Sequence, residues 1–200
     1  MNNQTPPKQK TNTMNLNSKT ASVEVFVNLG ENPNTPVILS VDAAQKTGWA
    51  IYKNGRIIEH GTKQLKRTSK FGCYGEWLKR MINKYNVNCI VAEDVFRKKD
   101  HTRENAYSAL TKMQGVLLYV IETEGLESAF LNPLLIKDTM IPTVYWKKHE
   151  RTEDKKRMIN RVQSLGYGLD SDTADDEADA IGILITYLKS KKYPLTHPQK

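Results

Sequence analysis

One stretch restricts the folds open to this 200-residue chain more than any other. Residues 37–52 consist of an apolar run ending in Asp42, a short polar segment and a second apolar run. This pattern predicts a β-strand, a reversal and a returning strand. Because side chains alternate along a strand, Asp42 shares a face with Ile38 and Ser40, at the end of a run that otherwise belongs in a core. Either Asp42 starts the turn, with Gly48 helping the chain to reverse, or its carboxylate serves a site.

The segments that follow predict a mixed order of strands and helices. Residues 56–65, after an Asn54-Gly55 turn, predict a third strand, so that three antiparallel strands come first. Apolar residues at helical spacing predict a helix over residues 75–85, which leads into a strand at residues 87–93. Because a helix precedes this strand, we expect it to run parallel to an earlier one. Periodicity further predicts a helix over residues 105–123, a strand over 128–131, one helical turn over 134–138, a helix ending near Gly166 and a last apolar helix that ends the folded region at about Leu188.

These elements predict one α/β domain, with a mixed five-stranded sheet of three antiparallel strands followed by parallel strands, flanked by helices. We expect this domain to span residues 37–190, with a C-terminal tail over residues 191–200. Residues 1–36 are rich in Asn, Thr, Gln, Pro and Lys and predict a mostly disordered tail, in which residues 23–29 form an extra strand or a docking segment. The sequence has no apolar run of membrane-spanning length and no signal-peptide pattern, so we expect a cytoplasmic protein.

The balance of charge favours a polyanionic partner. Lys and Arg number 30 against 22 acidic residues, which gives a formal net charge of +8. Such an excess is typical of proteins that bind nucleic acid, although a basic protein without such a partner is the alternative. The two cysteines cannot form a four-thiolate zinc site, and Cys89 is expected to be a reduced core thiol.

Further acids occur in apolar settings similar to that of Asp42. Glu93 ends the predicted parallel strand, whereas Asp176 and Asp179, three residues apart, share a face at the start of the last helix. Helix capping by Thr173 with Asp176 is one explanation. It accounts less well for Asp179, which directly precedes the apolar part of the helix.

If the two strand ends and the helix start meet, their carboxylates converge on one spot. Clustered like charges raise one another's pKa and are tolerable only around a cation. Oxygen ligands suit Mg²⁺, or Mn²⁺ as a substitute, better than zinc. In a basic protein, a carboxylate site for two metal ions indicates hydrolysis of phosphodiester bonds.

Three motifs carry a resemblance to a known family. They are Ser-Val-Asp-Ala-Ala-Gln-Lys-Thr-Gly-Trp-Ala-Ile-Tyr at residues 40–52, Val-Ala-Glu-Asp-Val-Phe at 91–96 and Asp-Glu-Ala-Asp-Ala-Ile-Gly-Ile at 176–183. In this order they resemble the motifs of the RuvC-type Holliday junction resolvases, in the RNase H-like superfamily. The resemblance implies an RNase H-like fold, a homodimer and metal-dependent cleavage of four-way DNA junctions by paired nicks. It places the metal-binding, catalytic acids at Asp42, Glu93, Asp176 and Asp179.

The first motif also departs from the cellular members of that family. Ala43-Ala44 stands where those members usually have Pro-Gly after the first Asp, and the following Lys-Thr-Gly-Trp looks more like the phage-type members. The expected setting is therefore a bacterial or phage-infected cell. A nuclease with relaxed specificity for branched DNA is consistent with the same motifs.

The resemblance further assigns roles in two basic segments. It places a base-stacking aromatic at Phe96 and a catalytic lysine near the metal ions at Lys155. An aromatic side chain on a basic loop can stack on unpaired bases while cations hold phosphates, although a buried loop anchor is the alternative for Phe96. The second basic run is alternatively a solvated helix face. The candidate DNA-binding residues are Phe96, Arg97, Lys98, Lys99, Arg103, Lys147, Lys148 and Arg151, with Lys156 and Arg157 in the same run as Lys155.

The predicted helix over residues 105–123 has more apolar surface than one sheet face needs. Core packing is one explanation, and a dimer interface is the one that the resemblance implies; the flanking residues are Tyr107, Leu110, Leu118 and Tyr119.

The leading hypothesis is a Mg²⁺-dependent endodeoxyribonuclease for Holliday junctions or other branched DNA, acting in recombination, repair or phage DNA processing. One alternative is a nuclease of the same fold that acts on RNA or RNA–DNA hybrids. The other is a non-catalytic structural binder of branched DNA. This binder is disfavoured, because it would gain nothing from gathering acids beside phosphates.

Overall fold

The computed structural model describes residues 35–95, 104–141, 151–170 and 172–198, with the side chains of residues 67, 104–106 and 151 left out. The chain divides into two units, Met1–Gly30 and Glu31–Lys200, and all described residues belong to the second unit. The predicted N-terminal tail, apart from its last two residues, therefore lies outside the described part, as does its apolar patch at residues 23–29.

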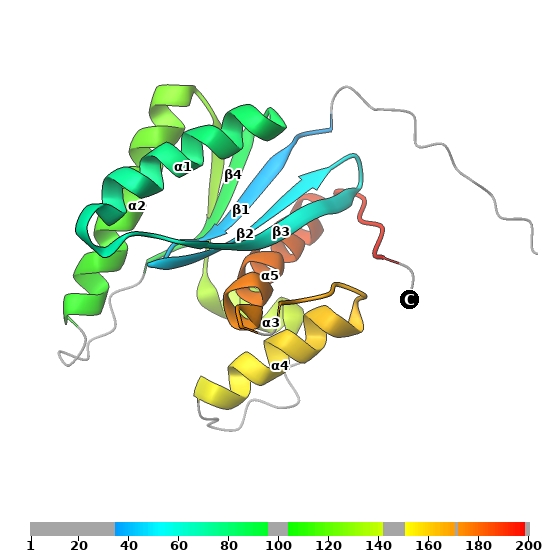
Figure 1. Cartoon of the computed structure of the whole chain (residues 1–200). Coiled ribbons are helices and arrows are strands. Elements are labelled where there is room, and N and C mark those ends of the chain that lie inside the picture. Colours follow the sequence, from blue (N-terminus) through cyan, green and yellow to red (C-terminus); the bar gives the residue numbers. More distant parts are fainter. Residues whose placement is uncertain (1–34, 96–103, 142–150, 171, 199–200) are drawn as a thin grey trace, which may run out of the picture. The chain divides into compact units, whose positions relative to one another are not determined.

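Five strands form one mixed sheet in the order β3-β2-β1-β4-β5 (Figure 1). The first three strands are antiparallel, and β4 and β5 then extend the sheet in parallel with β1. Asn54 and Gly55 join β2 to β3 with positive φ angles of 50° and 80°, as a two-residue hairpin turn requires. The predicted sheet is confirmed; its strands are β1 (Ile38–Asp42), β2 (Lys46–Lys53), β3 (Arg56–Gln64), β4 (Cys89–Glu93) and β5 (Glu127–Leu131).

Helices cover both faces of this sheet (Figure 1). A 3-10 turn (η1, Arg67–Ser69), α1 (Lys70–Tyr85) and α2 (Glu104–Glu124) come before β5, and α1 and α2 pack on one face. The opposite face carries α3 (Pro133–Met140), α4 (Arg151–Ser164) and α5 (Ala174–Lys191). The segment predicted as one helical turn is thus a full helix, because Asn132 caps it by accepting a hydrogen bond from the Leu134 amide at 2.8 Å.

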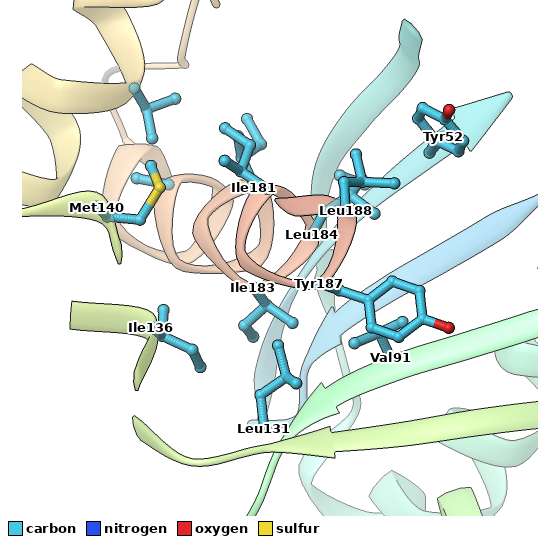
Figure 2. Close-up of a cluster of buried hydrophobic side chains, with 14 of the residues drawn as sticks. Tyr52, Val91, Leu131, Ile136, Met140, Ile181, Ile183, Leu184, Tyr187 and Leu188 are labelled. Atoms are coloured by element: carbon cyan, nitrogen blue, oxygen red, sulfur yellow. The ribbon is translucent and has the colours of Figure 1, made fainter. Parts of the chain in front are cut away.

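Helix α5 is the centre of one of the two apolar cores. Every residue from Ala180 to Leu188 is buried, because the sheet covers one side of the helix while α3 and α4 cover the other. Figure 2 shows Ile183 of α5 next to Leu131 of the sheet, and Met140 of α3 on a different side of the helix. This packing fixes the position of the helix that begins with the predicted acids.

The folded region extends further than the sequence predicted. Helix α5 continues to Lys191, and Tyr193 and Leu195 pack against the core beyond it. The Tyr52 hydroxyl donates to the Pro194 carbonyl at 2.7 Å, which ties this segment to β2. The prediction that order ends at about Leu188 is therefore wrong. Within the described residues, none of the helices combines the length and apolar character needed to cross a membrane.

Candidate active site

The predicted acids meet where β1 and β4 end and α5 begins. Strands β1 and β4 are parallel, and Val41 of β1 pairs with Ala92 of β4. The next residue on each strand is an acid, so Asp42 and Glu93 lie side by side where the two strands end. The Ser40 hydroxyl donates to the Ala180 carbonyl at 2.8 Å, which holds the first turns of α5 against the face that carries Asp42. The strand ends and the helix start thus converge as the sequence predicted.

Gly48 allows α5 to come this close to the sheet. It is the register partner of Asp42 on β2, and a Cβ atom at this position would lie only 1.8 Å from the Asp176 carbonyl oxygen. The sequence offers Gly48 as a turn residue, but Gly48 lies inside β2, and the chain reverses at residues 43–45. The Thr47 hydroxyl supports that reversal by donating to the Ala44 carbonyl at 2.6 Å.

Burial and mutual repulsion raise the pKa of three of these acids. Burial raises the pKa of Asp42 well above its usual value, and the charges of Asp179, Glu93 and Asp176 raise it further. Burial, followed by the charge of Glu93, raises the pKa of Asp179 to about 7. Burial also raises the pKa of Asp176, with Asp175 adding to the effect. These carboxylates therefore share one electrostatic environment that is short of positive charge.

Two lysines supply part of that positive charge. The Lys155 ammonium lies 2.5 Å from the carboxylate of Asp175 and lowers the pKa of that acid through this hydrogen bond. The same ammonium partly opposes the raised pKa values of Asp42 and Asp179. On the other side, the Lys46 ammonium lies 3.3 Å from the carboxylate of Asp176. Lys155 thus lies near the acids, as predicted, but its direct partner is Asp175.

One acid at the start of α5 has an anchoring role. Glu177 is buried, and its carboxylate accepts a hydrogen bond from the Thr173 hydroxyl at 2.7 Å. The other carboxylate oxygen lies 3.2 Å from Nδ1 of His60 on β3. The capping interaction considered for Thr173 and Asp176 is absent, because the Thr173 side chain bonds Glu177 and makes no side-chain cap.

The composition of the acidic cluster fits a hard divalent cation, whereas its side-chain arrangement is not yet a coordination shell. Asp42, Glu93, Asp176 and Asp179 offer only oxygen ligands, and a bound cation would offset the unfavourable charge that accompanies the raised pKa values of Asp42, Asp176 and Asp179. In the part of the chain that is described, no group of three His, Cys, Asp or Glu side chains is arranged to hold a metal ion.

Most of the predicted DNA-binding residues lie outside the described part of the chain. Residues 96–103 include Phe96 and four of the basic residues, and residues 142–150 include Lys147 and Lys148. Arg151 is the first residue of α4, and its side chain is not described. Of the remaining basic run, Lys156 is exposed, and Arg157 forms an ion pair with Glu153 one turn away at 2.6 Å.

Sequence reasoning missed Lys46, Asp175 and Glu177. Strand alternation could have identified Lys46, because Lys46, Gly48 and Ala50 share one face of β2 and Ala50 is buried against α5. No comparable signal exists for Asp175, whose partner Lys155 lies on a different helix, or for Glu177, whose partner His60 lies on β3. These pairs depend on tertiary contacts that a local pattern does not encode.

The sheet order and the helices on its faces define an RNase H-like fold of the type found in the RuvC-type resolvases. The structure of Thermus thermophilus RuvC with a Holliday junction substrate matches with a TM-score of 0.59 and 12% identity, over 80% of this chain and 98% of that chain. Yeast mitochondrial Holliday junction resolvase Ydc2 matches with a TM-score of 0.53 and 12% identity, over 78% and 79% of the two chains. The structure of fowlpox virus resolvase with Holliday junction DNA matches with a TM-score of 0.51 and 17% identity, over 78% of this chain and 98% of that chain.

These similarities confirm the predicted fold. No family model and no curated protein sequence matches this chain. At such low identities the comparison establishes the architecture alone, and the activity has to be argued from the site.

Proposed function

We propose that this protein is an endonuclease that uses divalent metal ions, Mg²⁺ in the first place, to cut Holliday junctions or other branched DNA. The observation that carries the proposal is the meeting of Asp42, Glu93, Asp176 and Asp179 where β1 and β4 end and α5 begins, where burial and the neighbouring acids raise the pKa of Asp42 and Asp179. Support comes from the fold, because two of the matching structures are resolvases in complex with Holliday junctions.

The four carboxylates would hold the metal ions, and Asp42 and Asp179 each interact with all of the other three acids. Metal ions bound there would activate water and stabilise the leaving oxygen of a phosphodiester. Lys155, whose charge reaches both Asp42 and Asp179, keeps these acids closer to their ionised, metal-binding form. The basic segments at residues 96–103 and 147–151 would bind DNA phosphates, and Phe96 would stack on an unpaired base.

Cutting a four-way junction symmetrically requires two active sites, so we also propose that the protein acts as a homodimer. Helix α2 offers a surface for this contact. Its buried side, which includes Met113 and Leu117, packs in the core, whereas Leu110, Leu118 and Tyr119 are 38%, 43% and 64% exposed. A two-fold axis along this exposed apolar face would bury it and pair the two sites.

Cleavage of a synthetic four-way junction tests the activity. Wild type and Asp42→Asn are compared in Mg²⁺ and in EDTA, with a linear duplex and an RNA–DNA hybrid as control substrates. Asp138→Asn makes the same chemical change at an exposed position on α3, outside the acidic cluster. We expect Asp42→Asn to cut at least about 100-fold more slowly than the wild type, because loss of a metal ligand should cost more than the loss of a residue that merely supports one. Asp138→Asn should cut like the wild type.

Three results would contradict the proposal. Junction cleavage that persists in EDTA or in Asp42→Asn would exclude the proposed chemistry. Cutting of the hybrid alone would identify an RNase of the same fold. Binding of the junction by every variant, without cutting by any, would identify a structural binder of branched DNA.

A further inference from the structure

Lys46 makes an ion pair with one of the proposed metal ligands. Its ammonium lies 3.3 Å from the Asp176 carboxylate and donates a hydrogen bond to the Asp172 carbonyl at 2.6 Å. The Lys46 side chain is 33% exposed and that of Asp176 is 18% exposed, so solvent screens this pair only in part. The contact joins the first residue of β2 to the first turn of α5.

Both ends of this contact are held by other interactions. Lys46 pairs with Gln64 in the β2–β3 ladder, and the Leu65 amide donates to the Gln45 carbonyl at 2.9 Å just before it. The first turn of α5 is held by the bonds of buried Glu177 to Thr173 and His60. The fold therefore fixes the backbone positions from which the Lys46 and Asp176 side chains reach one another.

A lysine in this place competes directly with a metal ion. The Asp176 oxygen that pairs with the Lys46 ammonium is a weaker ligand for a divalent cation, and a positive charge beside a cation site also repels the incoming ion. A divalent cation bound among the four acids would draw the Asp176 carboxylate away from Lys46 and toward the other acids. That movement breaks the bond to Lys46 but leaves the hydrogen bond to the Asp172 carbonyl available.

We propose that Lys46 is a positioning residue that holds the Asp176 carboxylate in the cation-free protein and releases it when a divalent cation binds the acidic cluster. Lys46 thereby sets the cation concentration at which the site assembles. The inference rests on the proposed function in one respect, namely that these acids bind metal ions.

Binding of Mn²⁺ to the protein without DNA, measured by electron paramagnetic resonance of the free ion, tests this role. Lys46→Met removes the charge with little change in side-chain length, and Lys46→Arg retains the charge. Lys63→Met is the matched control, because Lys63 pairs with Thr47 and so points to the sheet face opposite to that of Lys46. We expect Lys46→Met to bind Mn²⁺ more tightly, on the order of 5-fold, and the other two variants to bind like the wild type.

The outcomes separate this inference from the proposed function. Wild-type affinity in Lys46→Met would exclude competition for Asp176, and weaker binding together with a lower melting temperature would reduce Lys46 to a structural brace. Both results overturn the inference but leave the metal site intact. Two other results would overturn the inference and the proposed metal site together. One is a wild-type protein that binds no Mn²⁺, and the other is an Asp42→Asn variant that binds Mn²⁺ with wild-type affinity.

Discussion

Replacement of Gly48 by alanine tests whether the close approach of β2 and α5 forms the active site. The added Cβ would lie 1.8 Å from the Asp176 carbonyl oxygen and 2.5 Å from its carbon. Real Cβ atoms essentially never come within 3.0 Å of another heavy atom, so the two elements must separate by at least about 1.2 Å at this point. The obstructing atoms belong to the backbone of a helix, so no side-chain rotation can relieve the clash.

The expected result is a large loss of activity with a smaller loss of stability. A misplacement of about 1 Å can cost about 100-fold in rate, and Asp176 itself is one of the proposed ligands. Forcing an extra methyl group into a packed contact costs about 1–3 kcal/mol in the free energy of unfolding. Junction cleavage gives the first quantity and urea denaturation gives the second.

Gly72→Ala on α1 is the matched control, since a Cβ there meets no atom within 4 Å. We expect this variant to cut like the wild type and to gain up to about 1 kcal/mol of stability from helix propensity. Wild-type cleavage and Mn²⁺ affinity in Gly48→Ala would refute the reasoning. A loss of stability well beyond the expected range would show that Gly48 serves the packing of the core more than the geometry of the site.

Three further predictions follow from the site and its surroundings. The pKa values of Asp42 and Asp179 are raised in the folded, metal-free protein, so the contribution of these two acids to stability falls as pH rises from about 4 to about 7; scanning fluorimetry should show Asp179→Asn gaining melting temperature relative to the wild type over this range, and a constant difference would contradict it. His60→Ala leaves one oxygen of buried Glu177 without its partner and should cost about 1–3 kcal/mol in urea denaturation, so an unchanged midpoint would exclude an anchoring role. Leu118→Glu on the exposed face of α2 should convert the proposed dimer to a monomer in light scattering, and a monomeric wild type would refute that interface.

The fold was predictable because its signals are local. Alternation around Asp42, the Asn54-Gly55 turn and the helical periodicity that precedes Glu93 together predicted the direction of every strand, and the sheet confirms them. The end of the folded region was not predictable in this way. Apolar periodicity stops at Leu188, whereas the order of the next residues depends on contacts such as the one between Tyr52 and Pro194.

In the candidate site, too, the residues with local sequence signals could be predicted and those that depend on tertiary contacts could not. An acid directly beside an apolar run stands out in the sequence, which is why Asp42 and Asp179 could be proposed without a structure. Their environment depends on how closely α5 approaches β2, and three consecutive residues of β2 arrange that approach in different ways. Lys46 binds Asp176, Thr47 fixes the reversal of the chain, and Gly48 leaves room for the helix backbone.

The energetic cost of the acidic cluster is itself an argument for function. Burial and mutual repulsion make the ionised forms of Asp42 and Asp179 unfavourable in the metal-free protein, and neutral side chains at these positions would remove that cost. Buried acids with strongly raised pKa values occur mainly at sites that bind a ligand or catalyse a reaction. Because the chain carries a formal net charge of +8, the proposed function would bring DNA phosphates to bound cations at the one place where the described fold gathers these acids.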